Sequence, residues 1–398
     1  MLFLLACESR NEFNHKQRDE TFKQNYYRLF RLKLPHMDAV DNLFEKLNPT
    51  EIEGFRCCLI HALIEKRVFH RFRFFDKYFY VAIDGTGVYN WNESSPEEIL
   101  DQAITKESHT GRKSYSFQAL EAVLVSRNGM SIPLLNEWVA NKGEVYDKQD
   151  CEINAFKRLS ERLKRFFPRL NICILADGLY SNVVIMNICR QYGWKFITVF
   201  RDGNLPSVWK EVESLLPLTG AGGCSQRLLC DSTHMITRNY RWINNIEYKN
   251  HVINWIECVQ VIAHTKSGGK KHNRFVFITN LELDDRNIIS VLAAGRARWL
   301  IEDYFNTQKN RGGNLHHKFN RTNFNALKNW HNVRQLVGMI NEFVEHTRES
   351  MQMMKEHTKM TLKELWKNLN SYLSMCSVGD TMVAFEQWSK QARQVRLE

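Results

Sequence analysis

Long apolar runs are absent from this sequence of 398 residues, which has no window of about 18 consecutive apolar residues, roughly the length that spans a membrane. We therefore expect no membrane span and no membrane partner. The opening stretch "MLFLLAC" resembles a lipoprotein cleavage site, but it lacks a basic segment and is too short for a signal peptide. A cytoplasmic protein is expected, and the stretch is also compatible with a shortened or misassigned start.

Clustered cysteines are absent as well. The ten cysteines are scattered singly, apart from adjacent Cys57 and Cys58, so reduced thiols are expected. Cys224, Cys230 and His234 have loose metal-ligand character, but their spacing is wide and no fourth ligand is near. Small buried cysteines and a loop histidine are favoured there over zinc. No internal repeat, helix-turn-helix or zinc module is recognisable.

Acidic residues are missing from one long window, because no Asp or Glu occurs between Tyr304 and Asn341. The whole chain carries 55 Lys and Arg against 44 Asp and Glu, a net charge of +11, which favours a polyanionic partner such as nucleic acid. Contact with phosphates would explain the window. The alternative is a basic surface that meets an acidic patch of the same protein. The cations concerned are Lys309, Arg311, Lys318, Arg321, Lys328 and Arg334.

The order of predicted elements indicates an α/β fold. Two helices are expected in 37–66, and a strand over "KYFYVAID" that ends at Asp84 before a turn at "GTG". A polar loop over 92–115 and a hairpin of 118–125 with 130–139 follow.

The next elements alternate between helix and strand. They are a helix at 148–166, the strand "ICILAD" ending at Asp177, a helix near 181–191 and a strand at 195–200. This order implies parallel pairing through right-handed crossovers. Residues 203–283 look mainly β, and helical periodicity returns at 284–310 and 322–347.

Two aspartates occupy equivalent places in this pattern. Asp84 and Asp177 are each the first polar residue after an apolar strand, and each is followed by Gly. Each could simply cap the next turn. Ligands, however, bind at the strand ends of α/β sheets, and carboxylates on parallel neighbours could share Mg²⁺, a cation that prefers oxygen ligands.

A third carboxylate is found in "GRARWLIEDYFNTQKNRGG", residues 295–313. On one continuous helix, at about 100° per residue, Arg298, Glu302 and Lys309 form a stripe beside a buried face. The simplest interpretation is an Arg to Glu ion pair worth a few tenths of a kcal/mol. Glu302 could instead complete a two-metal site with Asp84 and Asp177.

These three motifs together resemble the DDE transposases of bacterial insertion sequences, which have an RNase H-like catalytic domain. The similar branch carries a Tyr, Arg, Glu, Lys signature and a β insertion between its second and third acids. It matches here as "VAIDGTG", "ILADGLYSN" and "R-x3-E-x6-K", through Arg298, Glu302 and Lys309. The resemblance covers roughly residues 77–345. One departure is Gly295, which stands where the signature has tyrosine.

The resemblance implies an RNase H-like mixed sheet flanked by helices, interrupted by the β insertion and extended by helices at both ends. It implies a cut-and-paste transposase in which Asp84, Asp177 and Glu302 hold two Mg²⁺ ions, with Mn²⁺ as a substitute. Arg298 and Lys309 would bind phosphates. The expected partners are transposon-end DNA with terminal inverted repeats, target DNA and a second copy in a synaptic dimer; a hairpin intermediate is one possible route. The expected place is the bacterial cytoplasm, at the nucleoid.

The corresponding division of the chain follows the motifs. It has a helical N-terminal region (1–76) with possible DNA-end contact, a first catalytic part (77–202), the insertion (203–283), the final catalytic helices (284–347) and a helical C-terminal region (348–398).

Two further segments have open interpretations. The stretch 22–34 interleaves basic and aromatic residues, and it could contact the transposon end or dock as an amphipathic helix on the core. Trp299 could stack on an unpaired base or belong to the core. Two alternative functions remain open. One is a structure-selective nuclease or resolvase with the same fold, and the other is a non-catalytic DNA-binding derivative of a transposase.

Overall fold

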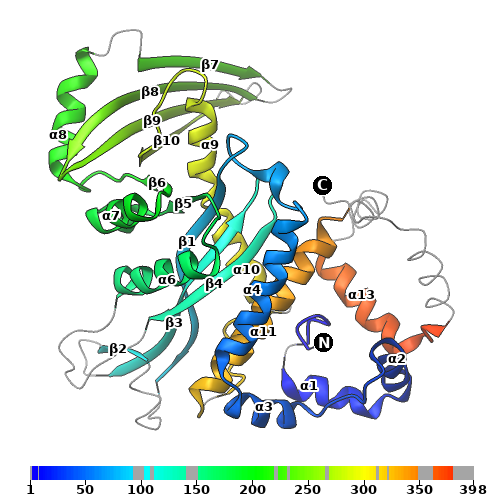
Figure 1. Ribbon diagram of the computed structural model, residues 1–398. Coiled ribbons are helices and arrows are strands. Elements are labelled where there is room, and N and C mark those ends of the chain that lie inside the picture. The colour runs from blue at the N-terminus through cyan, green and yellow to red at the C-terminus, as the bar shows by residue number, and fades with distance from the viewer. Residues whose placement is uncertain are drawn as a thin grey trace.

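The computed structural model describes residues 2–7, 9–92, 103–107, 112–139, 151–218, 223–230, 234–264, 269–310, 313–320, 322–347 and 362–379. These residues form a mixed α/β fold in which one large sheet is flanked by helices (Figure 1). The α/β class predicted from the sequence is thereby confirmed. None of the helices described is both long and apolar enough to cross a membrane.

The sheet has the strand order β2-β3-β1-β5-β6-β10-β9-β8-β7, and β4 also pairs with β3. The pairs β1 with β5 and β5 with β6 are parallel, the second of them as the strand and helix alternation predicted, and the other pairs are antiparallel. The strands are β1 Phe79–Trp91, β2 Ile104–Glu107, β3 Lys113–Val125, β4 Ser131–Val139, β5 Ile172–Ala176, β6 Lys195–Val199, β7 Cys224–Cys230, β8 His234–Tyr248, β9 His251–His264 and β10 Lys270–Thr279.

Helices cover both faces of this sheet. The helices are α1 Arg10–His15, α2 Glu20–Phe30, α3 Met37–Lys46, α4 Pro49–Glu65, α6 Glu152–Phe166, α7 Val183–Tyr192, α8 Pro206–Leu215, α9 Ile288–Ala297, α10 Leu300–Asn310, α11 Phe324–Glu345 and α13 Leu362–Met375. Short 3₁₀ turns occur at Lys16–Arg18, His70–Phe72, Gly178–Tyr180 (η3) and Leu216–Leu218.

Alternation along β1 assigns its side chains to two cores. Val81 and Ile83 pack with α6 and α7, whereas Tyr80 and Ala82 pack with α9 and α10. Successive side chains of a strand point to opposite faces, so Asp84 belongs to the face that carries α9 and α10.

The predicted end of β1 was wrong. The strand does not stop at Asp84 but continues through "GTG" to Trp91, because β3 pairs with it along this whole length, with Asp84 opposite Glu121. The predicted loop over 92–115 was also wrong in part, since β2 and the start of β3 lie inside it.

The predicted continuous helix at 284–310 is two helices. The α9 helix ends at Ala297, Arg298 is its C-cap, and α10 begins at Leu300. The stripe calculated for one straight helix therefore does not apply across Arg298. The helix expected from 148 begins at Glu152, and 140–150 lie outside the described residues.

Residues 203–283 contain α8 and then the antiparallel strands β7 to β10. The last of these strands, β10, pairs with β6, so these strands extend the central sheet instead of forming a separate one. In Figure 1 they occupy the top of the molecule, above the strands β1 and β5.

The N-terminal and C-terminal helices lie together at the opposite end (Figure 1). In α2, Phe22 is buried and the Asn25 amide donates to carbonyls of Leu373 and Cys376, so α2 docks on α13. This supports the docking interpretation of 22–34, while Tyr27 and Phe30 remain exposed. Of the predicted C-terminal region, residues 348–361 and 380–398 lie outside the described part.

Candidate active site

Asp84 and Asp177 lie side by side at the end of the parallel pairing between β1 and β5. The last registered pair is Ile83 with Ala176, and each aspartate is the next residue along the chain. Parallel strands carry their carboxyl ends to the same edge of a sheet, where ligands bind in α/β folds. The two motifs that the sequence singled out are thus brought together.

Backbone groups hold both aspartates. The Gly85 amide donates to Asp84 Oδ1 at 3.0 Å, and the Leu179 amide donates to Asp177 Oδ1 at 2.9 Å. Asp177 therefore does cap the short η3 turn, as the simpler interpretation predicted. Its other oxygen, Oδ2, lies 3.4 Å from the Arg201 guanidinium, so capping uses only part of the carboxylate.

Glycines after the two aspartates leave space for other side chains. A Cβ on Gly85 would lie 2.7 Å from Oε1 of Glu152, and one on Gly178 would lie 3.2 Å from the Arg201 side chain. The Asp-Gly pairs of the sequence thus permit close approach by an acid in one case and a base in the other.

Arg298 connects the first acid to the third. Its guanidinium lies 3.3 Å from Asp84 Oδ2 and 2.5 Å from Glu302 Oε1. The Arg298 side chain is only 8% exposed, whereas that of Glu302 is 55% exposed. The ion pair proposed from the sequence exists, but it also ties Glu302 to a strand residue far away in the chain.

The environment of Asp84 disfavours its negative charge. Burial raises its pKa to about 6, and the nearby charges of Asp177 and Glu302 act in the same direction. The guanidinium of Arg298 and the Gly85 amide oppose this rise. A cation bound nearby would therefore stabilise the charged form of this carboxyl group.

A fourth acid, which sequence reasoning missed, lies beside these groups. Glu152 is the first residue of α6, and Tyr180 donates its hydroxyl to Glu152 Oε2 at 3.2 Å. Burial raises the pKa of Glu152, the hydrogen bond from Tyr180 lowers it, and the charge of Asp177 raises it. Acidic residues are common at the start of helices, so the sequence alone gave no sign that Glu152 lies beside the other acids.

The donor set suits Mg²⁺ or Mn²⁺, since every candidate ligand is a carboxylate oxygen. Arg298 already places a cationic group between Asp84 and Glu302. In the part of the chain that is described, no three His, Cys, Asp or Glu side chains are close enough together to hold one ion. Instead, Arg298 pairs with Asp84 and Glu302, and Arg201 pairs with Asp177.

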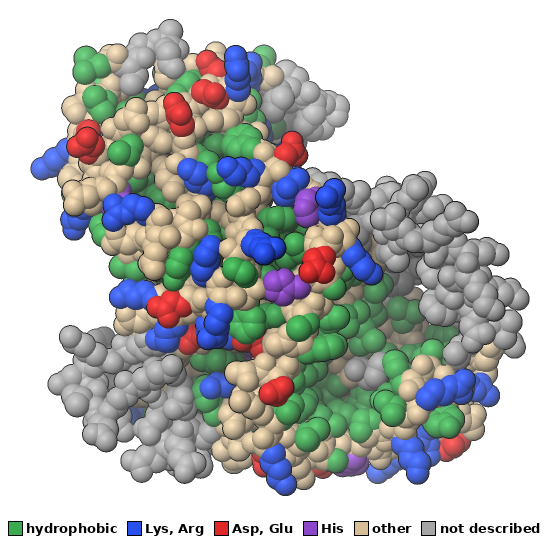
Figure 2. Space-filling model, viewed as in Figure 1, with side chains coloured by type: hydrophobic (Ala, Val, Ile, Leu, Met, Phe, Trp, Pro, Cys, Tyr) green, Lys and Arg blue, Asp and Glu red, His purple; other side chains and the backbone are tan. Residues whose placement is uncertain are grey.

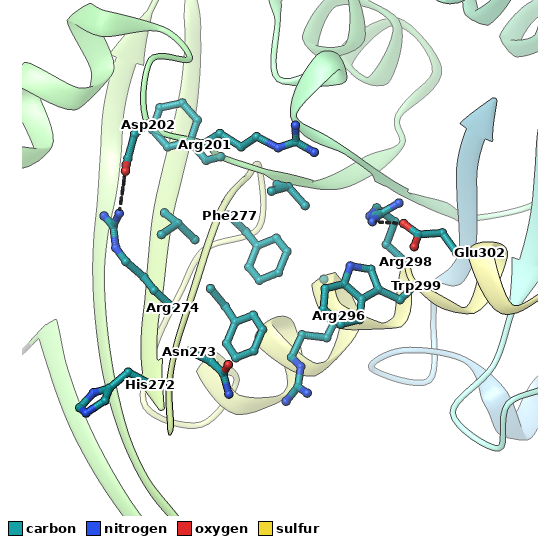
Figure 3. A pocket seen from close by; sticks show the side chains of 15 residues that line it. Arg201, Asp202, His272, Asn273, Arg274, Phe277, Arg296, Arg298, Trp299 and Glu302 are labelled. Carbon is teal, nitrogen blue, oxygen red and sulfur yellow. Dashed lines mark hydrogen bonds and ion pairs between the residues drawn. The ribbon is translucent and has the colours of Figure 1, made fainter. Parts of the chain in front are cut away.

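A groove of about 720 Å³ opens beside Glu302, between β10 and the junction of α9 with α10 (Figure 3). Arg201, Arg296 and Arg298 line it with Trp299, while Arg274 pairs with Asp202 at 3.0 Å on the opposite wall. Trp299 is 55% exposed, so its interpretation as a core residue was wrong. The groove is therefore basic and partly aromatic.

Gly295 lines the same groove, and its surroundings leave little space for a side chain. A Cβ at Gly295 would lie 2.8 Å from the ring of Phe277 on β10. The Phe277 ring thus fills the space that a larger residue would need.

The predicted DNA contacts separate into several groups. Arg334 is buried and donates to the Gly313 carbonyl and to His331, so the prediction that it binds DNA was wrong. It belongs to a buried network that reaches Glu121 through His331. Arg311 and Arg321 lie outside the described residues.

The remaining cations of the window are closer to the surface. Lys318 lies over the Tyr89 ring and Lys328 over the Phe324 ring, at 4.7 and 4.2 Å from the ring centres. Lys309, in the last turn of α10, forms no ion pair with the acids described. On the face drawn in Figure 2, Lys and Arg side chains gather across the middle.

The candidate zinc ligands receive no support. None of the described cysteines forms a disulfide, and Cys224 is exposed, but the side chains of Cys230 and His234 lie outside the described part.

Comparison of the chain with protein-family models and with curated protein sequences gave no match.

Proposed function

We propose that the protein is a DDE-type DNA transposase with an RNase H-like catalytic domain. One observation carries the proposal: parallel strands place Asp84 beside Asp177, and Arg298 ties Glu302 to Asp84. These are the three acids, in the same order along the chain, that the resemblance to insertion-sequence transposases marks. The β7 to β10 strands between the second and third acids agree with it.

The acids would hold the metal ions. Asp84, Asp177 and Glu302 supply the oxygen ligands that two Mg²⁺ or Mn²⁺ ions require. When bound, such ions activate an attacking oxygen and stabilise the leaving one in phosphodiester chemistry. Arg298 would then turn from the carboxylates to a phosphate, because its bonds to Asp84 and Glu302 compete with cations for the same oxygens.

The surrounding groove would take the DNA. Lys309 and the exposed arginines of the groove provide phosphate contacts beside the acids. Trp299 offers an exposed aromatic face to an unpaired base near the cleavage point. Water would cut the transposon end, and the freed 3′-hydroxyl would attack target DNA, with two copies of the chain pairing two ends.

The test uses a labelled duplex that carries the terminal inverted repeat flanking the gene, incubated with the protein in Mg²⁺. Asp177→Asn keeps a side-chain oxygen for the Leu179 amide but removes the charge. We expect it to bind the duplex normally and to lose end cleavage and joining by at least about a hundredfold.

Asp285→Asn is the matched control, because Asp285 is an exposed aspartate outside the site. Undiminished cleavage by Asp177→Asn would overturn the proposal. Cleavage that depends on branched DNA structure, with no need for the repeat, would favour the nuclease or resolvase instead.

A further inference from the structure

Glu152 reaches the strand ends from the helix layer opposite α10. It begins α6, which packs on the face occupied by Val81 and Ile83. Its Oε1 lies only 2.7 Å from the position that a Cβ on Gly85 would occupy. Any side chain at residue 85 would displace this carboxylate, so the glycine beside Asp84 makes its approach possible.

The second oxygen of Glu152 is held from the other acid motif. Tyr180, the last residue of the η3 turn that Asp177 caps, donates its hydroxyl to Oε2 at 3.2 Å. Tyr180 is itself buried, and its ring packs edge-on against Phe156 of α6. The carboxylate is therefore oriented by one residue from each of the two Asp-Gly motifs.

Charge compensation differs between Glu152 and the other acids. Asp84 and Glu302 share Arg298, and Asp177 has Arg201. Glu152 has no ion pair among the described residues, although Asp177 repels it. A partly buried carboxylate held beside another acid, without a base, is an arrangement that a cation would stabilise.

A purely structural role is the alternative. An acid in the first turn of a helix interacts favourably with the helix dipole, and Glu152 is in that position. That role needs neither the close approach at Gly85 nor the hydrogen bond from Tyr180. It also predicts no dependence of cation binding on Glu152.

We propose that Glu152 is a fourth acidic residue of the site and supplies a carboxylate oxygen to a divalent cation bound beside Asp177. This inference rests on the proposed function, because it concerns the same metal-dependent site. The site would then draw acids from both helix layers, Glu302 from α10 and Glu152 from α6. Gly85 and Tyr180 would be positioning residues for Glu152.

The experiment measures Mn²⁺ binding to the full chain without DNA, by calorimetry and by the electron paramagnetic resonance signal of free Mn²⁺. We expect Glu152→Gln to weaken Mn²⁺ binding about tenfold or more. Glu161→Gln is the matched control, because Glu161 is an exposed glutamate of the same helix. Tyr180→Phe keeps the charge and should weaken binding by a smaller factor.

The outcomes separate the inference from the proposed function. Equal Mn²⁺ affinity in wild type and Glu152→Gln, with a loss in Asp177→Asn, would overturn the role of Glu152 alone. Weaker binding in Glu152→Gln together with wild-type protein that never cuts repeat-bearing DNA would overturn the transposase and leave the cation site standing. Absence of Mn²⁺ binding in wild type would overturn both.

Should Glu152→Gln fail to fold, Glu152→Asp serves as the second variant. It keeps the charge but shortens the side chain, which withdraws the oxygen from Gly85. Weaker Mn²⁺ binding supports the inference, and wild-type affinity overturns it.

Discussion

The guanidinium of Arg298 lies 3.3 Å from the carboxylate of Asp84, although 214 residues separate them in the chain. The same guanidinium holds Glu302 at 2.5 Å. Arg298 is the C-cap of α9 and lies directly before α10, which carries Glu302. The positively charged side chain of Arg298 therefore bridges Asp84 and Glu302, the first and third acids.

Arg298→Gln should destabilise the protein in the absence of divalent cations. Asp84 would lose its charged partner while remaining largely buried, and such losses cost roughly 1–3 kcal/mol. Urea unfolding with and without Mn²⁺ measures this, and Mn²⁺ should restore more stability to the variant than to wild type.

Arg296→Gln is the control for that measurement. Arg296 lies over the ring of Phe275, two positions from Arg298, and touches none of the acids. If both variants have the same stability and the same response to Mn²⁺, Arg298 does not act as a substitute cation.

Gly295→Tyr would introduce the residue that the transposase signature has at this position, and we expect it to destabilise the protein. Its Cβ would clash with the Phe277 ring, and overpacking of this kind costs about 1–3 kcal/mol. The double variant with Phe277→Ala provides the room, so its cost should be smaller than the sum of the two single costs. Urea unfolding of all four proteins completes the cycle, and additive costs would contradict the clash.

The arrangement of Asp84 and Asp177 was predictable because it depends on local patterns. Each of the two apolar runs is followed by Asp-Gly, which predicted that both aspartates lie at one edge of the sheet, and the register of β1 with β5 agrees. The end of β1 was not predictable in this way. Whether a strand continues past a polar residue depends on a partner strand, here β3, and no local pattern reports that.

The same limit applies to the helices around the site. The break at Arg298 is set by how α9 and α10 pack on the sheet, so the periodicity of one segment could not reveal it. Glu152 resembles any acid at a helix start until Gly85 and Tyr180 are seen around it. Arg334 was misread for a related reason, since a cation in an acid-free window gives no sign of burial.

Lys309→Ala should weaken DNA binding without changing stability, whereas Arg334→Met should lower stability without changing the salt dependence of DNA binding. Loss of one phosphate contact at Lys309 should reduce the slope of log affinity against log salt by about 0.9 and leave stability unchanged. Arg334→Met removes a buried charge that bonds Gly313 and His331, at a cost of about 3–5 kcal/mol.

Fluorescence anisotropy with a random-sequence duplex at several salt concentrations gives the slope, and urea unfolding gives the stability. The Arg334 variant is assayed at a temperature where it is folded, and its salt slope should equal that of wild type. A reduced slope in that variant would mean that Arg334 does reach DNA.

The buried His331 should make the stability of the protein depend on pH. The Arg334 guanidinium can only donate, so His331 Nδ1 accepts, and the ring is neutral with Nε2 donating to Glu121 at 2.6 Å. Burial is the main cause that lowers the pKa of His331, and Glu121 opposes it.

A histidine whose pKa is lowered in the folded state stabilises the protein above its unfolded pKa of about 6.5, and this contribution is lost as the pH falls below that value. From His331 alone, the loss reaches at most about 1.4 kcal/mol per pH unit. Urea unfolding between pH 7.5 and 5, approximately, should therefore give a shallower pH dependence for His331→Gln than for wild type. His15→Gln, at an exposed histidine, should keep the wild-type dependence. A His331→Gln curve parallel to that of wild type would show that the pKa of His331 does not differ between the folded and unfolded states.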